Sequence, residues 1–169
     1  MDRRLHIIGV GSPFGDDRLG WVAVEALQCS TTLAAAGGGC ISFVVLDHPG
    51  ALLMAHWHNA DYVIVVDAVR SDAPPGTCHR LQPAEWTALA SVSSHGFGLA
   101  SALALARALG DLPPHLVLYG MEIDPSSTGF SLSEPVRHSL PGMIREIERE
   151  ACACIGFPCF TCLPTIRQG

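Results

Sequence analysis

Four short runs of β-branched and other apolar residues, separated by stretches with helical spacing, constrain the fold of this chain more than any other feature. The runs are "LHIIGVG" (5–11), "ISFVVLD" (41–47), "DYVIVVDAV" (61–69) and "HLVLYGMEI" (115–123). Apolar strands that alternate with helices are typical of a sheet whose core strands are parallel and covered by helices on both faces. The pattern therefore predicts an α/β fold.

The intervening segments carry helix signals. "DDRLGWVAVEAL" follows the first strand with apolar residues at helical spacing, and "ALLMAHWHNA" is expected to be a short helix. A long helix is expected to end before Gly110, and Ser133 is expected to cap the N-terminus of a last helix. The chain is thus predicted to contain at least four helices.

Three segments break this regular pattern. "GTCHRLQ" (76–82) is interpreted as a further, less regular strand, and "AAAGGGC" (34–40) as a flexible surface loop. Pro141 and Gly142 are expected to interrupt the last helix, because proline lacks the N–H that a helix interior needs.

The length and composition predict one domain. A chain of 169 residues with 49% hydrophobic content can bury a sizeable core. We expect a single α/β domain over residues 1–150 and a Cys-rich tail over residues 151–169. The tail holds Cys152, Cys154, Cys159 and Cys162, which are spaced more tightly than the usual two-pair zinc arrangement and are interpreted as thiols without a metal.

The charge and hydropathy patterns exclude several classes of partner. Ten basic residues against 16 acidic ones give a formal net charge of -6, which argues against a nucleic-acid partner. The longest apolar segment is interrupted by Arg107 and is shorter than the ~20 residues that a membrane span needs. The apolar run before Pro13 is also too short for a signal peptide. We therefore expect a cytoplasmic protein that binds neither nucleic acid nor membrane.

A glycine-rich loop followed by two acids leaves the first strand. The stretch "GVGSPFGDDRLG" (9–20) begins like a nucleotide-binding loop, but its glycine spacing misses G-x-G-x-x-G and Asp16 and Asp17 would repel a phosphate. A nucleotide-binding enzyme is therefore the least favoured hypothesis.

Three polar positions are expected to meet at one edge of the sheet. In parallel α/β sheets, ligands bind beyond the carboxyl ends of the strands, where Asp17, Asp67 and the loop that carries His95 are expected. Two carboxylates and an imidazole can bind a divalent ion and leave coordination positions open. Taken singly, each has an ordinary explanation: Asp16 or Asp17 as a helix cap, Asp67 bonded to a backbone turn, and His95 as a structural or exposed side chain.

Several stretches resemble one known family, over about residues 5–150. "IIGVGSPFGDDRLG", "VIVVDAVRSDAPPGT", "SSHGFGLASAL" and "GFSLSEPV" resemble, in this order, motifs of the endopeptidases that trim the C-terminus of the [NiFe]-hydrogenase large subunit during its maturation. The resemblance implies a three-layer α/β/α fold with a mixed, mostly parallel five-stranded sheet, in which one strand is antiparallel.

The resemblance also implies a site and a substrate. It places the metal-contacting residues on Asp17, Asp67 and His95, which are the same three positions. It implies no permanent cofactor: the three residues would recognise nickel already inserted in the large-subunit precursor, for which zinc or cadmium could substitute in vitro. It does not identify a general base, and Asp16 is the nearest candidate.

Two departures from the family pattern, and one alternative function, stay open at this point. Ser12 stands where the family usually has Asn, and "LDHPG" (46–50) replaces a common Asp-Gly-Gly. The same three ligands without a competent base would give a non-catalytic chaperone that binds nickel or the precursor. The sequence does not separate this chaperone from an endopeptidase.

Overall fold

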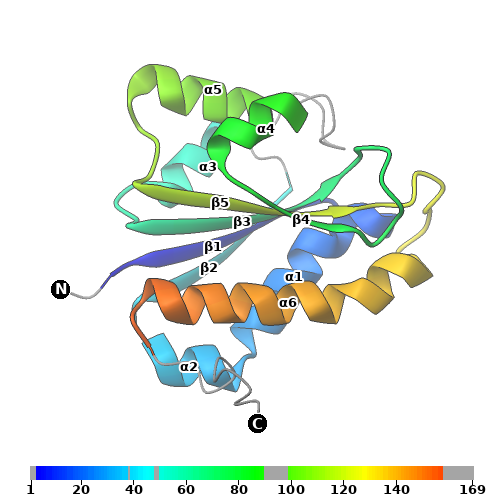
Figure 1. The fold of residues 1–169 in the computed structure, drawn as a ribbon, viewed down its shortest axis with the longest axis horizontal. Helices are drawn as coiled ribbons and strands as arrows, with labels where there is room; N and C mark the ends of the chain where they lie inside the picture. The colour runs from blue at the N-terminus through cyan, green and yellow to red at the C-terminus, as the bar shows by residue number, and fades with distance from the viewer. Residues whose placement is uncertain (1–2, 38, 48–49, 90–98, 158–169) are drawn as a thin grey trace, which may run out of the picture.

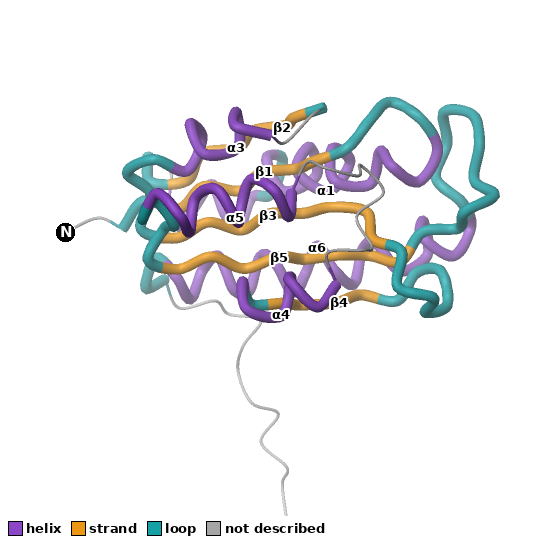
Figure 2. The backbone as a smooth tube through the Cα atoms, turned by 90° about the horizontal axis from the view of Figure 1, so that it is seen from above, coloured by secondary structure: helices purple, strands orange, loops and turns teal. Residues whose placement is uncertain are grey.

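Five strands form one mixed sheet in the computed structural model, which describes residues 3–37, 39–47, 50–89 and 99–157. Figure 2 shows the strands side by side in the order β2-β1-β3-β5-β4. The first four are mutually parallel and β4 runs antiparallel to β5. Their bounds are β1 Leu5–Val10, β2 Ile41–Leu46, β3 Tyr62–Val69, β4 Cys78–Leu81 and β5 His115–Glu122. The mixed, mostly parallel α/β sheet is thereby confirmed.

Helices cover both faces of this sheet (Figure 1). One face carries α1 (Leu19–Gln28), α2 (Thr31–Gly37) and α6 (Glu134–Cys154), and the other carries α3 (Gly50–Trp57), α4 (Pro83–Leu89) and α5 (Leu99–Leu109). Because side chains alternate along a strand, each face has its own apolar core. Ile7 and Ile64 pack on the α1/α6 side, whereas Ile8 and Val65 pack on the α3/α5 side.

Helix α1 lies unusually close to the sheet because glycines face each other at the contact. A Cβ on Gly20 would stand 2.1 Å from the carbonyl oxygen of Val10 and 2.7 Å from that of Val66. A Cβ on Gly9 would stand 2.2 Å from the carbonyl oxygen of Gly20. Only glycine permits such an approach. The first turn of α1 is therefore fixed against the ends of β1 and β3, next to Asp67.

The expected break in the last helix is wrong. Helix α6 continues from Glu134 to Cys154 with Pro141 inside it. Pro141 is on the exposed side of the helix, while Leu140, Met143 and Ile147 are buried against the core. This burial compensates for the hydrogen bond that proline cannot make.

The expected loop at residues 34–40 is also wrong over its first part, because Thr31–Gly37 forms α2. The Ser30 hydroxyl accepts a hydrogen bond from the Leu33 amide at 3.2 Å, and the Leu33 side chain is buried. A capping serine and one buried leucine therefore order an alanine-rich run that lacks an apolar stripe. Helix α4 (Pro83–Leu89) likewise had no counterpart among the expected helices.

Helix α6 extends beyond the predicted start of the tail. Ala151 and Cys152 are fully buried in the core, and the helix ends at Cys154. Cys159 and Cys162 lie outside the described residues. Within the described part of the chain, no helix combines the length and the apolar character needed to cross a membrane.

Candidate active site

The two acids of the first loop lie in a short 3-10 helix, η1 (Gly15–Arg18), between β1 and α1. Neither acid is the N-cap of a helix, because those positions are Phe14 for η1 and Arg18 for α1. Asp16 and Asp17 are neighbours in sequence but differ in their surroundings.

The Asp16 carboxylate is buried and fully engaged. Only 1% of the residue is exposed. It accepts hydrogen bonds from the amide of Asp124 at 3.0 Å, the amide of Ser133 at 2.6 Å and the hydroxyl of Ser133 at 2.7 Å. Ser133 precedes α6 as predicted, but its hydroxyl bonds to Asp16 and makes no cap hydrogen bond. These contacts favour a structural role for Asp16 over that of a general base.

Asp17 differs from Asp16 in the hydrogen bonding of its carboxylate. Its Oδ1 atom is buried and has no hydrogen-bond partner among the described residues. A buried carboxylate oxygen without a donor is costly unless a cation or another donor satisfies it. The Asp17 backbone carbonyl accepts the amide of Ser12 at 3.1 Å, which fixes the turn around it. The geometry is suited to a metal ligand.

Asp67 lies at the carboxyl end of β3, inside the sheet. The residue is completely buried, and its Oδ1 accepts a hydrogen bond from the Ala68 amide at 2.8 Å. It shares a sheet face with Val63 and Val65, which pack in the α3/α5 core. Because η1 contacts β3, the segment that carries Asp17 lies beside the strand that carries Asp67.

The third predicted ligand, His95, lies outside the described residues, as do His48 and Pro49 of the "LDHPG" stretch. The first described residue after His95 is Leu99, which begins α5, and α5 covers the sheet face on which Asp67 lies. The residues that the structure describes contain no group of three His, Cys, Asp or Glu side chains able to hold a metal ion. The three-residue ligand set therefore stays a prediction.

Glu122 is a further buried acid at the same edge, which sequence reasoning missed. It ends β5 and is 3% exposed. Its carboxylate accepts the amide of Ser71 at 2.7 Å and the hydroxyl of Ser71 at 2.8 Å, and His79 Nε2 lies 3.7 Å from its Oε2. The available signal was an acid at the end of an apolar strand, as at Asp67. These bonds hold the segment that follows β3.

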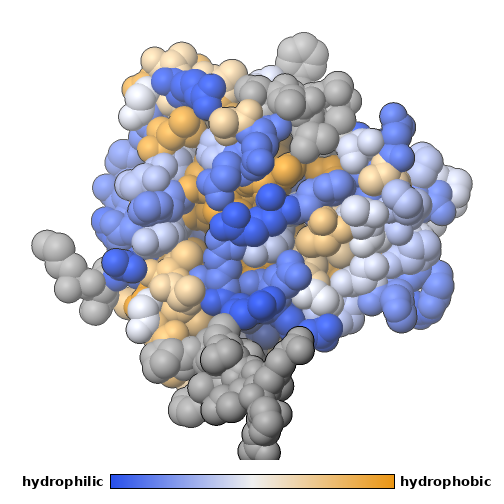
Figure 3. All heavy atoms as spheres, viewed as in Figure 1, coloured by the Kyte–Doolittle hydropathy of each residue, from blue (hydrophilic) through white to orange (hydrophobic). Residues whose placement is uncertain are grey.

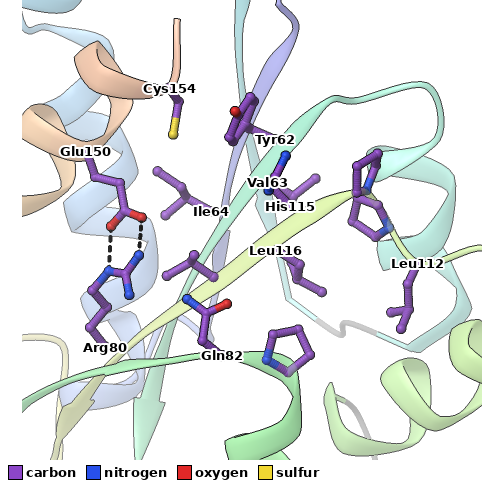
Figure 4. A pocket seen from close by; sticks show the side chains of 14 residues that line it. Tyr62, Val63, Ile64, Arg80, Gln82, Leu112, His115, Leu116, Glu150 and Cys154 are labelled. Atoms are coloured by element: carbon purple, nitrogen blue, oxygen red, sulfur yellow. Dashed lines mark hydrogen bonds and ion pairs between the residues drawn. The ribbon is translucent and has the colours of Figure 1, made fainter.

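A cavity of about 320 Å³ lies elsewhere, at the amino-terminal ends of β3 and β5. Figure 4 shows Tyr62 and His115 on one side of it and Cys154 above it. On the face that carries β4, hydrophobic residues are visible between hydrophilic ones (Figure 3). The cavity is at the opposite edge from Asp17 and Asp67, so it does not belong to the candidate site.

Arg80 and Glu150 form a bidentate ion pair beside this cavity (Figure 4). Glu150 accepts bonds from Arg80 Nε at 2.8 Å, from a second Arg80 nitrogen at 2.5 Å and from the Tyr119 hydroxyl at 2.5 Å. Burial raises the pKa of Glu150, but the hydrogen bonds from Arg80 and Tyr119 outweigh it, so the pKa is lowered overall. The pair fastens α6 to β4 and β5.

Glu150→Gln should lower the free energy of unfolding at pH 7 by about 1–2 kcal/mol, since the charged acceptor of three hydrogen bonds is lost. Because the folded-state pKa of Glu150 is lowered, its stabilisation is present at neutral pH and is lost as the pH falls through that pKa. Urea titrations at several pH values should show the variant and wild type converging in acid. Glu134→Gln, in an exposed pair with Arg137, is the control and should change stability by less than about 0.5 kcal/mol.

Comparisons with known proteins agree with this architecture. The family described as "Hydrogenase maturation protease" (HycI) matches residues 46–150. The hydrogenase expression/formation protein HupD of Thiocapsa roseopersicina is 31% identical over 82% of this chain, and the match spans 63% of that relative's length. The hydrogenase 2 maturation protease of Escherichia coli is 29% identical, over 88% of this chain and 94% of its own.

A solved structure gives the same result. The hydrogenase maturating endopeptidase HybD from E. coli superimposes with a TM-score of 0.69 at 27% identity, over 85% of this chain and 89% of that one. The matched family covers more than half of the chain, and the solved structure shares its α/β fold. This chain belongs to the hydrogenase maturation protease family.

Proposed function

We propose that this chain is a cytoplasmic endopeptidase that removes the C-terminal extension of a [NiFe]-hydrogenase large-subunit precursor after nickel insertion. Asp17, Asp67 and His95 would contact the nickel, which the precursor brings, so that the enzyme needs no resident metal. Zinc or cadmium would be able to replace nickel in vitro. Membership of the protease family supports the reaction class.

The observation that carries this proposal is the buried Oδ1 of Asp17, which has no hydrogen-bond partner in the described part of the chain. It lies in a turn held against the carboxyl end of β3, where Asp67 is completely buried. Oxygen and imidazole ligands suit a divalent ion, and a ligand set from separate loops leaves positions open for the precursor's own ligands. An enzyme with such a site would respond to whether nickel is present in its substrate.

The cutting step would follow from the same contacts. A peptide carbonyl next to the cation would be polarised for attack by water, which adds to the carbonyl carbon before the C–N bond breaks and the amine leaves with a proton. Because the buried Asp16 carboxylate already accepts three hydrogen bonds, the proton from water would pass to one of the other carboxylates of the site.

The test is to follow the mass of the cognate large-subunit precursor during incubation with this protein, with and without prior nickel loading. Loss of a C-terminal peptide only from the loaded precursor is the expected result. A stable complex with an intact precursor would instead support the non-catalytic chaperone. Cleavage of both samples at equal rates would contradict nickel recognition.

A further inference from the structure

Two exposed phenylalanines lie together at η1, the short helix that contains Asp17. Phe14 is 58% exposed and Phe130 is 69% exposed, and their ring centroids are 5.7 Å apart with the planes tilted by 39°. The other large hydrophobic side chains that are exposed in the described part of the chain are all aliphatic. Contiguous exposed apolar surface on a monomer often marks an interaction site.

The loops that carry the pair are fastened to each other. The Gly15 amide donates to the Gly129 carbonyl at 2.8 Å, and Arg18 Nη1 donates to the Phe130 carbonyl at 3.4 Å. Asp16 adds its bonds to Asp124 and Ser133, at the two ends of the same loop. Five hydrogen bonds therefore hold together the two segments that carry the rings, while the rings themselves stay exposed.

This arrangement suits capture of a polypeptide. A ring pair that is already in position loses little conformational entropy when it binds, and aromatic side chains are enriched among the residues that anchor protein interfaces. The Arg18 guanidinium beside the Phe130 carbonyl places a positive charge next to the rings, which disfavours a basic side chain as the occupant. An apolar side chain fits best.

We propose that Phe14 and Phe130 form a docking point for an apolar side chain of the large-subunit precursor, on the segment that passes Asp17. This inference rests on the proposed function, because it takes the precursor as the polypeptide. Phe14 lies three positions before Asp17 in the same turn, so a peptide segment held by the rings would pass the candidate metal ligands. The pair would contribute to capture of the precursor and not to the chemical step.

The experiment compares Phe14→Ala, Phe130→Ala and the double variant with wild type. Affinity for the nickel-loaded precursor and the values of KM and kcat for its cleavage are measured. Each single variant should raise Kd and KM about tenfold with kcat unchanged. The increase in Kd for the double variant should be smaller than the product of the two single-variant increases, since the rings form one surface. Leu109→Ala is the matched control, as Leu109 is 65% exposed at the end of α5 near the amino-terminal edge of the sheet.

The outcomes separate this inference from the proposed function. The docking point would be overturned if the Phe variants had the same Kd and KM as Leu109→Ala. It would also be overturned if they lowered kcat and left KM unchanged. Wild type that binds the precursor without cutting it would refute the endopeptidase, and the Kd values would still decide the role of the rings. Wild type that neither binds nor cuts would overturn both. Equal thermal midpoints are expected throughout, because the altered side chains are exposed.

Discussion

Asp17→Asn is expected to reduce processing of the nickel-loaded precursor by a factor on the order of a hundred or more, with the thermal midpoint unchanged or slightly raised. The substitution keeps the shape of the side chain but removes the charge that a divalent ion requires. Among the residues that the structure describes, none donates a hydrogen bond to the buried wild-type Oδ1, so the substitution removes no hydrogen bond to that atom from this part of the chain. A charged group held for a ligand commonly costs stability, and its neutral analogue relieves that cost.

The measurement combines the mass of the precursor over time with a thermal denaturation curve of each variant. Asp111→Asn serves as the control, because it also removes one negative charge but lies in the α5–β5 loop, at the opposite edge of the sheet. We expect wild-type processing from this control. Full cleavage by Asp17→Asn would remove Asp17 from the metal-contacting set.

Asp16→Ala, unlike Asp17→Asn, should destabilise the fold and lower the free energy of unfolding by about 3–5 kcal/mol. The substitution leaves the amides of Asp124 and Ser133 and the hydroxyl of Ser133 without their acceptor in a buried site. Asp16→Asn should also destabilise, because an amide cannot accept on both sides as a carboxylate does. Urea denaturation of both variants gives the free energies.

Any loss of processing activity in Asp16→Ala should be proportional to the loss of folded protein. A variant of wild-type stability that has lost activity would restore Asp16 as a candidate general base. Together with Asp17→Asn, the comparison assigns structural and functional roles to two adjacent carboxylates.

The sequence was sufficient for the parts of the fold that depend on local pattern. The apolar runs at 5–11, 41–47, 61–69 and 115–123 all became strands, and Gly110 follows the end of α5 as expected. Asp67 was correctly placed at the carboxyl end of a buried strand. The alternation of strands and helices predicted the parallel core strands, whereas the presence of one antiparallel strand was expected only from the family resemblance.

Long-range contacts explain what the sequence did not reveal. The expectation that Pro141 would break α6 was wrong. The helix tolerates this proline because its opposite face is buried against the core, which the local sequence does not reveal. The different surroundings of Asp16 and Asp17 depend on Asp124 and Ser133, more than one hundred positions away. A residue pattern near position 16 contains no information about donors that arrive from so distant a segment.

The three hydrogen bonds to the Asp16 carboxylate also have an evolutionary consequence. Three converging donors fix both the length and the charge of the side chain at position 16, so neither Glu nor Asn would fit there. Under the proposed function, the side chain at position 17 would be constrained by the metal ion that it contacts. A descendant of this protein that gave up proteolysis would be free to replace Asp17, yet would have to retain Asp16 to keep the loop before α6 in place.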